Sequence, residues 1–278
     1  MLRLKTKLRL KKLFESGNLE GMLVAIYVGI LGLCIGSFLN VLIDRLSNKQ
    51  GIGGRSHCDH CKRQLQVRDL IPVLSYVYTG GKCRYCYKHI SFYYPIVEIL
   101  TSVVFVTIYF AFIPSNISLL IVLIANLIIA SSLIVIFFAD LKYHIIPDEA
   151  TIALMIGAVI RLAPFVISLQ QLHAPITAGI ALALTLLFFF LITKGRGMGF
   201  GDVKLAFPMG FLLGLEGGFL ALYISFVTGG IVGLALLLLR KKGLKSKLPF
   251  GPFLVLGTIA ILIAGKPIRM FFHGLFGI

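Results

Sequence analysis

Long runs of apolar residues constrain the fold of this chain more than any other feature. A helix needs about 20 apolar residues to cross the hydrocarbon core of a bilayer. Apolar residues make up 58% of the sequence and charged residues only 14%, which excludes an ordinary soluble domain. Eight candidate runs lie at 22–43, 92–113, 117–139, 150–168, 175–193, 205–215, 217–239 and 251–272. We therefore predict an all-α polytopic membrane protein with about eight transmembrane helices.

The basic residues are distributed in a way that predicts the topology. Of the 27 Lys and Arg residues, 18 fall in four connections between apolar runs, namely 44–91, 140–149, 194–204 and 240–247. Because basic loops stay on the cytoplasmic side, we place these four connections in the cytoplasm. The net charge of +16 is thereby assigned to orientation and to contacts with membrane lipid, not to a nucleic-acid partner. The basic segment 1–16 disagrees, since eight spans would place it outside.

Two C-x-x-C pairs lie in the only sizeable polar region, 47–91. Four cysteines arranged as two tight turns suit tetrahedral Zn²⁺, because each turn directs two sulfurs at one ion. Two disulfides are the competing interpretation, but they rarely persist in the reducing cytosol; an iron site is the other alternative. We predict a structural zinc ion, which would supply much of the stability of so small a region. The predicted ligands are Cys58, Cys61, Cys83 and Cys86.

A glycine-rich stretch, Gly195 to Lys204, separates two of the apolar runs. Its glycines free the backbone from the helix just where Asp202 meets the membrane edge. A flexible basic loop and a functional site are both compatible with this stretch alone. The run 117–139 ends at Asp140, and the topology places both aspartates at the same cytoplasmic edge. A negative charge at the end of a helix opposes the helix dipole, so Asp140 has no obvious structural role there.

Two carboxyl groups brought within hydrogen-bond reach cannot both ionise easily, so such a pair would hold a single proton. That state suits peptide hydrolysis, in which one carboxylate activates water and the other acid polarises the carbonyl. We therefore predict Asp140 and Asp202 as a catalytic pair. Gly199 and Gly201 would let a substrate strand approach, and Lys142 or Lys204 would bias which aspartate is charged. Asp148 fits the first turn of the following helix, where negative charge matches the dipole.

One further carboxylate lies inside an apolar run. Glu98 sits about one helical turn into the segment that opens at Tyr93, at a depth where an unpaired charge is costly. Two interpretations remain open, a partner cation or a polar ligand.

Several motifs together resemble the bacterial type IV prepilin leader peptidases, which belong to the intramembrane GxGD aspartyl proteases. A GxGD sequence alone would be weak evidence, but the ordered set is highly specific. The matching pieces are Gly36-Ser37-Phe38-Leu39-Asn40-Val41, the two C-x-x-C pairs, Ile71-Pro72-Val73-Leu74-Ser75, Tyr94-Pro95-Ile96-Val97-Glu98, Asp140 with Ile146-Pro147-Asp148, and Gly199-Phe200-Gly201-Asp202-Val203-Lys204.

The resemblance implies cleavage of a basic leader after its glycine, at the cytoplasmic face of the bacterial inner membrane. The substrate would be a prepilin or a pseudopilin with a hydrophobic N-terminal helix. Many members also methylate the new N-terminus with S-adenosylmethionine, and Glu98 is our candidate residue for that activity. The alternative from another class is a zinc-bearing membrane transporter or scaffold that uses the aspartates as a proton or cation path.

These predictions divide the chain into four parts. They are a basic N-terminal extension at 1–21, a first transmembrane helix at 22–46, the cytoplasmic zinc-binding region at 47–91, and an aspartyl protease core of about seven helices at 92–278.

Overall fold

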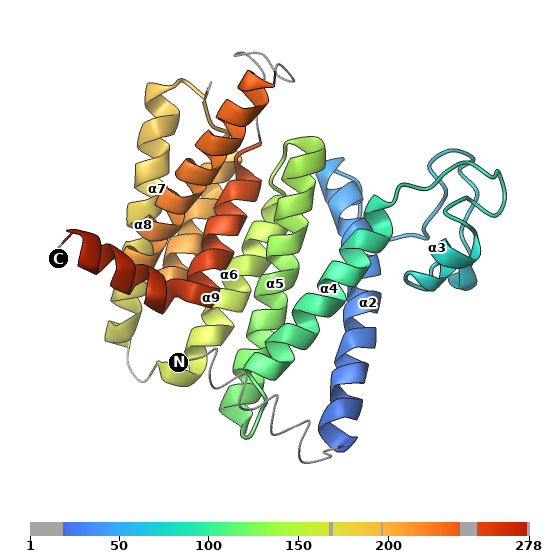
Figure 1. Ribbon diagram of the computed structural model, residues 1–278, viewed down its shortest axis with the longest axis horizontal. Helices are drawn as coiled ribbons and strands as arrows, with labels where there is room; N and C mark the ends of the chain where they lie inside the picture. Colours follow the sequence, from blue (N-terminus) through green and yellow to red (C-terminus); the bar gives the residue numbers. More distant parts are fainter. Residues whose placement is uncertain (1–18, 167–168, 196, 240–248, 277–278) are drawn as a thin grey trace. The chain divides into compact units, whose positions relative to one another are not determined.

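The computed structural model describes residues 19–166, 169–195, 197–239 and 249–276 (Figure 1). Over these ranges the chain is helical and forms no β-strand, only two isolated β-bridges in the cysteine region. It divides into two compact units, the first ending at Val135 and the second beginning at Ile136. The predicted basic extension lies almost wholly outside the described residues, as does the basic loop at 240–247.

The first unit is built on two antiparallel helices, α2 (Leu19–Ser47) and α4 (Tyr93–Ala111). They pack closely because α2 presents glycines to its neighbour. A Cβ atom on Gly32 would lie 2.6 Å from Cα of Ser102, and one on Gly36 would lie 2.7 Å from Cα of Glu98. Small residues of this kind allow helices to approach in a membrane, where apolar burial gives no driving force.

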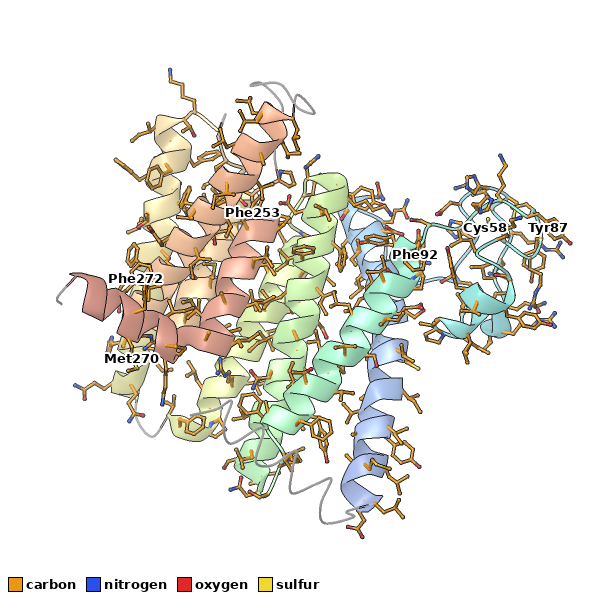
Figure 2. The ribbon with its side chains drawn as sticks, in the orientation of Figure 1. Cys58, Tyr87, Phe92, Phe253, Met270 and Phe272 are labelled. Carbon is orange, nitrogen blue, oxygen red and sulfur yellow. The ribbon has the colours of Figure 1, made fainter. Side chains whose placement is uncertain are left out.

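The polar region between α2 and α4 carries only short helices, η1 (Val67–Asp69) and α3 (Leu74–Tyr78). Figure 2 shows Cys58 and Tyr87 in this region, with Phe92 where the chain enters α4. A segment with so little regular structure cannot bury a large apolar core. Its local fold therefore depends on the polar contacts and cysteine turns described below.

In the part of the second unit that the structure describes, the end of α5 (Ile117–Tyr143) is followed by six further helical elements. Helix α8 packs against α6, α7 and α9. The α7–α8 packing is tight, since a Cβ atom on Gly210 would lie 2.6 Å from the carbonyl oxygen of Ala178. The elements after α5 are α6 (Asp148–Leu162), η2 (Ala163–Phe165), η3 (Leu169–Leu172), α7 (His173–Ile192), α8 (Phe200–Leu238) and α9 (Gly251–Phe276).

The all-α polytopic architecture is confirmed, with differences in how the apolar runs form helices. Among the described residues, six helices are long and apolar enough to cross a membrane, whereas α6 has only 15 residues. The runs 205–215 and 217–239 both belong to α8, which bends at Gly214 (φ 73°, ψ 175°). Only glycine adopts that conformation readily. Helix α9 bends at Ala264, three residues before Pro267 (Figure 1).

Candidate functional site

Asp140 lies in the last turn of α5, as the sequence predicts, and its side chain is buried, 6% exposed. The backbone N–H of Gly251, the first residue of α9, donates a hydrogen bond of 2.8 Å to Oδ2 of Asp140. Helix α5 ends directly after this turn, where His144 takes a left-handed conformation (φ 56°). His144 also interacts electrostatically with Asp140. The carboxyl group is therefore held at the start of one helix and the end of another.

Asp202 lies in the first turn of α8 and is likewise buried, 5% exposed. The backbone N–H of Gly199, the N-cap residue, donates a 3.0 Å hydrogen bond to Oδ2 of Asp202. An acidic side chain three residues after the N-cap satisfies an otherwise free N–H and complements the positive end of the helix dipole. The GxGD sequence thus fixes the carboxyl group through its own local fold.

The structure brings these two aspartates together. They are close enough for the charge of Asp140 to act on the carboxyl group of Asp202. The connection from α5 to α6 lies against the start of α8, since a Cβ atom on Gly201 would lie only 3.1 Å from Cβ of Ile146. Two buried, mutually interacting carboxyl groups, each held through one oxygen by a backbone N–H, can share a proton and act as an acid–base pair.

The lysines and Asp148 that were predicted to support the site make contacts with their own neighbours. Nζ of Lys204 forms an ion pair with Asp148, 2.8 Å from Oδ1 and 2.9 Å from Oδ2. Asp148 is the first residue of α6, in agreement with its predicted place at a helix start. Nζ of Lys142 lies 4.9 Å from the ring centroid of Tyr143, a cation–π contact. Gly201 packs against the chain's own Ile146, a role that the sequence alone did not indicate.

Gly251 is the principal site residue that sequence reasoning missed. A Cβ atom there would lie 2.6 Å from Oδ2 of Asp140, so no larger side chain fits without displacing the carboxyl group. Pro252, directly after it, signals a helix start, because proline is favoured in the first turn. That signal predicts where α9 begins, but it does not indicate which side chain the helix start faces.

The four predicted zinc ligands form one cluster in the first unit. Their Sγ atoms all lie within 4.8 Å of one another, and the Cys58 and Cys86 sulfurs are 3.9 Å apart. Zinc–thiolate bonds of about 2.3 Å in a tetrahedron require sulfurs about 3.8 Å apart, so the donor set and its size fit Zn²⁺. None of the four is in a disulfide. Such an ion would tie together two turns that are far apart in sequence.

The two cysteine turns have matching backbone geometry. In each, the first cysteine N–H donates to a carbonyl five residues later, that of Arg63 for Cys58 and that of Lys88 for Cys83. Lys62 and Tyr87 occupy equivalent left-handed positions (φ 56° and 57°). Burial raises the pKa of the Cys83 thiol, but hydrogen bonds from the backbone N–H groups of Tyr85 and Cys86 and from the thiols of Cys58 and Cys86 outweigh it and lower this pKa to about 7. The same network of thiols raises the pKa of Cys86 to about 11. A thiolate is the form that binds metal.

Glu98 is buried in the first unit, and its partners are not cations. The backbone N–H of Val73 donates a 2.8 Å hydrogen bond to Oε2, and the Ser37 hydroxyl also bonds to the carboxylate. No Lys or Arg among the described residues forms an ion pair with it. The geometry therefore does not support the interpretation that Glu98 pairs with a cation.

Comparisons with known proteins agree with the motifs. Residues 30–112 match the family model for the bacterial peptidase A24 N-terminal domain, and residues 127–234 match that for the type IV leader peptidase family.

Curated relatives match over most of the chain. The prepilin leader peptidase/N-methyltransferase of Aeromonas hydrophila is 32% identical, over 84% of this chain and 89% of its own length. Its counterpart in Bacillus subtilis (strain 168) is 32% identical, over 87% and 95%. The Legionella pneumophila protein is 33% identical, over 89% and 93%. No solved structure gives a significant match.

Proposed function

Because the chain belongs to the type IV leader peptidase family, we propose that Asp140 and Asp202 cleave the leader peptide from a prepilin or pseudopilin. The observation that carries this proposal is the pair itself, two buried aspartates that interact electrostatically and are each fixed by a backbone N–H. The comparisons give no support to the transporter or scaffold hypothesis.

The proposed reaction uses the two carboxyl groups in different protonation states. The ionised carboxylate takes a proton from a water molecule as the water oxygen attacks the scissile carbonyl carbon. The protonated carboxyl group donates its hydrogen bond to the carbonyl oxygen. When the tetrahedral intermediate breaks down, the C–N bond breaks and the leaving nitrogen takes up a proton. The hydrogen bonds from Gly199 and Gly251 keep one oxygen of each group fixed, which preorganises the pair.

The enzyme is a multi-pass membrane protein of the bacterial inner membrane. We place its active site at the cytoplasmic face, because the basic connections flank both aspartates in sequence. The leader that it would remove is basic and is followed by a hydrophobic helix, so membrane lipid is a natural second contact. We further assign residues 47–91 to a zinc-binding region and 92–278 to the protease core.

The names of the relatives include N-methyltransferase, and we extend this second activity to the chain. S-adenosylmethionine would supply the methyl group for the new N-terminus. The acceptor-rich polar cluster around Glu98, described in the next subsection, is chemically suited to a cationic group, and both methyl-transfer substrates carry one.

One experiment tests both activities. The purified protein in detergent is incubated with a prepilin, with and without S-adenosylmethionine, and the N-terminus of the product is analysed by mass. We expect loss of the leader in both reactions and a gain of one methyl group only with the methyl donor. An intact prepilin in both reactions would contradict the peptidase assignment.

A further inference from the structure

A second buried polar cluster lies in the first unit, where α2 and α4 pack together. Gly36 contacts Glu98 across the antiparallel pair. One turn further along α2, Nδ2 of Asn40 donates a 3.0 Å hydrogen bond to the carbonyl oxygen of Tyr94. Asn40 is 5% exposed and Glu98 is 8% exposed. Asn40 and Glu98 therefore lie about one helical turn apart along the buried contact between α2 and α4.

The backbone next to Glu98 is strained. Val73 has φ 61° and ψ −48°, a γ-turn closed by a 2.6 Å hydrogen bond from the Leu74 N–H to the Pro72 carbonyl. A β-branched residue in this region is a true outlier, and such strain persists only where the surroundings determine it. The turn directs the Val73 N–H onto Oε2 of Glu98 at 2.8 Å. The Glu98 carboxylate is thus held in one position from outside its own helix.

The cluster is rich in hydrogen-bond acceptors. A carboxylate offers about four lone-pair positions, and Val73 and Ser37 use only two of those on Glu98. Oδ1 of Asn40 is buried without a hydrogen-bond partner among the described residues. Nearby, the Tyr94 hydroxyl lies 2.9 Å from Asp44 and 3.4 Å from Asp59 of the first cysteine turn. A buried carboxylate and an unsatisfied amide oxygen together suit a ligand with a positive charge and N–H donors.

We propose that this cluster binds the α-amino group of the newly cleaved N-terminus and that Glu98 takes its proton for methyl transfer. The inference rests on the proposed methyltransferase activity. An α-ammonium group has no free electron pair, so it must lose one proton before it can react. That proton moves to Glu98. The nitrogen lone pair then forms the N–C bond to the methyl group, while the C–S bond of the sulfonium donor breaks and its electron pair stays on sulfur.

The first test is equilibrium binding and needs neither leader removal nor methyl donor. A synthetic peptide with the mature pilin N-terminus is titrated into the full-length protein in detergent, beside the same peptide N-acetylated. We expect the free-amine peptide to bind at least about tenfold more tightly, because it alone can form the charged hydrogen bonds. Glu98→Gln should remove that preference. The glutamine carbonyl can still accept the Val73 N–H, so the strained turn keeps its partner.

A second measurement follows methyl transfer to the free-amine peptide when S-adenosylmethionine is added. We expect Glu98→Gln to slow it by about 10²-fold or more, the usual loss when a general base is removed. Glu216→Gln is the matched control, an exposed glutamate that pairs with Arg269 in the second unit, and it should change neither measurement. Zinc content should be equal in the wild type, Glu98→Gln and Glu216→Gln.

Several outcomes would overturn the proposal. They are equal binding of the two peptides by the wild type, an amine preference that survives Glu98→Gln, or methyl transfer at the normal rate in that variant. If Glu98→Gln does not fold, Asn40→Leu replaces it and should weaken the preference several-fold. A wild type that binds the amine selectively but fails to cleave a prepilin would contradict the peptidase assignment and leave this site supported. A wild type that cleaves but never methylates would overturn the inference.

Discussion

The backbone N–H of Gly251 donates a 2.8 Å hydrogen bond to Oδ2 of Asp140, although 111 residues separate the two in sequence. Asp140 lies in the last turn of α5, where the helix dipole disfavours a negative charge. Gly251 begins α9, where free N–H groups and the positive end of a dipole favour one. The favourable interaction of the Asp140 carboxylate with the start of α9 therefore offsets its unfavourable interaction with the dipole of α5. The Asp140 carboxylate, which does not stabilise its own helix, is held in place by a different helix.

Gly251→Ala should reduce leader cleavage by about 10²-fold, because a shift of about 1 Å in a catalytic group can cost that much. The new methyl group would lie 2.6 Å from Oδ2 of Asp140, so the carboxyl group must move. Cleavage rates in detergent measure the effect. Gly230→Ala is the control, since nothing lies within 4 Å of a Cβ atom there, and it should cleave normally. Normal cleavage by Gly251→Ala would show that this close contact is not required.

Local sequence patterns predicted much of the fold and the clustering of the four cysteines. Apolar runs of membrane-spanning length became helices because length and hydrophobicity are properties of each segment alone. The cysteine cluster could be predicted for a similar reason, since a C-x-x-C turn orients its own two sulfurs. The position of Asp202 in the first turn of α8 also has a local cause, because the residues that cap this helix, from Gly199 onward, are adjacent in sequence.

Several other contacts between distant segments could not be predicted. Nothing in the run 251–272 indicates that its first N–H meets Asp140, because this depends on how α9 packs within the second unit. The two predicted runs on either side of Gly214 form one bent helix, α8. The sequence did not predict this bend, because a single glycine in an apolar run does not reveal its backbone angles. The strained turn at Val73 is even harder to predict from the sequence, since valine disfavours positive φ. It depends on the carboxylate of Glu98, 25 residues later.

Asp140→Asn and Asp202→Asn should each abolish measurable leader removal, a loss of about 10²- to 10⁴-fold or more. An amide can neither take a proton from water nor donate one as an acid. Both variants should stay folded, because the amide oxygen can still accept the hydrogen bond from Gly251 or Gly199. Cleavage of a prepilin in detergent is compared with thermal unfolding of the same samples. Substantial cleavage by either folded variant would contradict the assigned pair.

The purified protein should contain close to one zinc ion per chain, as measured by elemental analysis. The double variant Cys58→Ser, Cys61→Ser should lose it, because two of four ligands cannot hold the ion. Cys34→Ser is the matched control, since Cys34 lies on α2 outside the cluster and is exposed. Protease digestion should cut residues 47–91 faster in the double variant, because the metal supplies stability that the small core lacks. A zinc-free wild type with two disulfides would contradict the prediction.

The ion pair between Lys204 and Asp148 should matter little for stability, despite its position beside the GxGD sequence. Its side chains are 42% and 60% exposed, so water screens the charges and the long lysine side chain loses entropy on pairing. Lys204→Gln and Asp148→Asn should each lower the free energy of unfolding by less than about 1 kcal/mol. The double variant should lose less than the sum, since the second change breaks a pair already broken. Thermal unfolding in detergent gives the four values. If Lys204→Gln instead leaves stability intact but lowers cleavage at least tenfold while Asp148→Asn does not, the lysine acts on the catalytic charge and not through this pair.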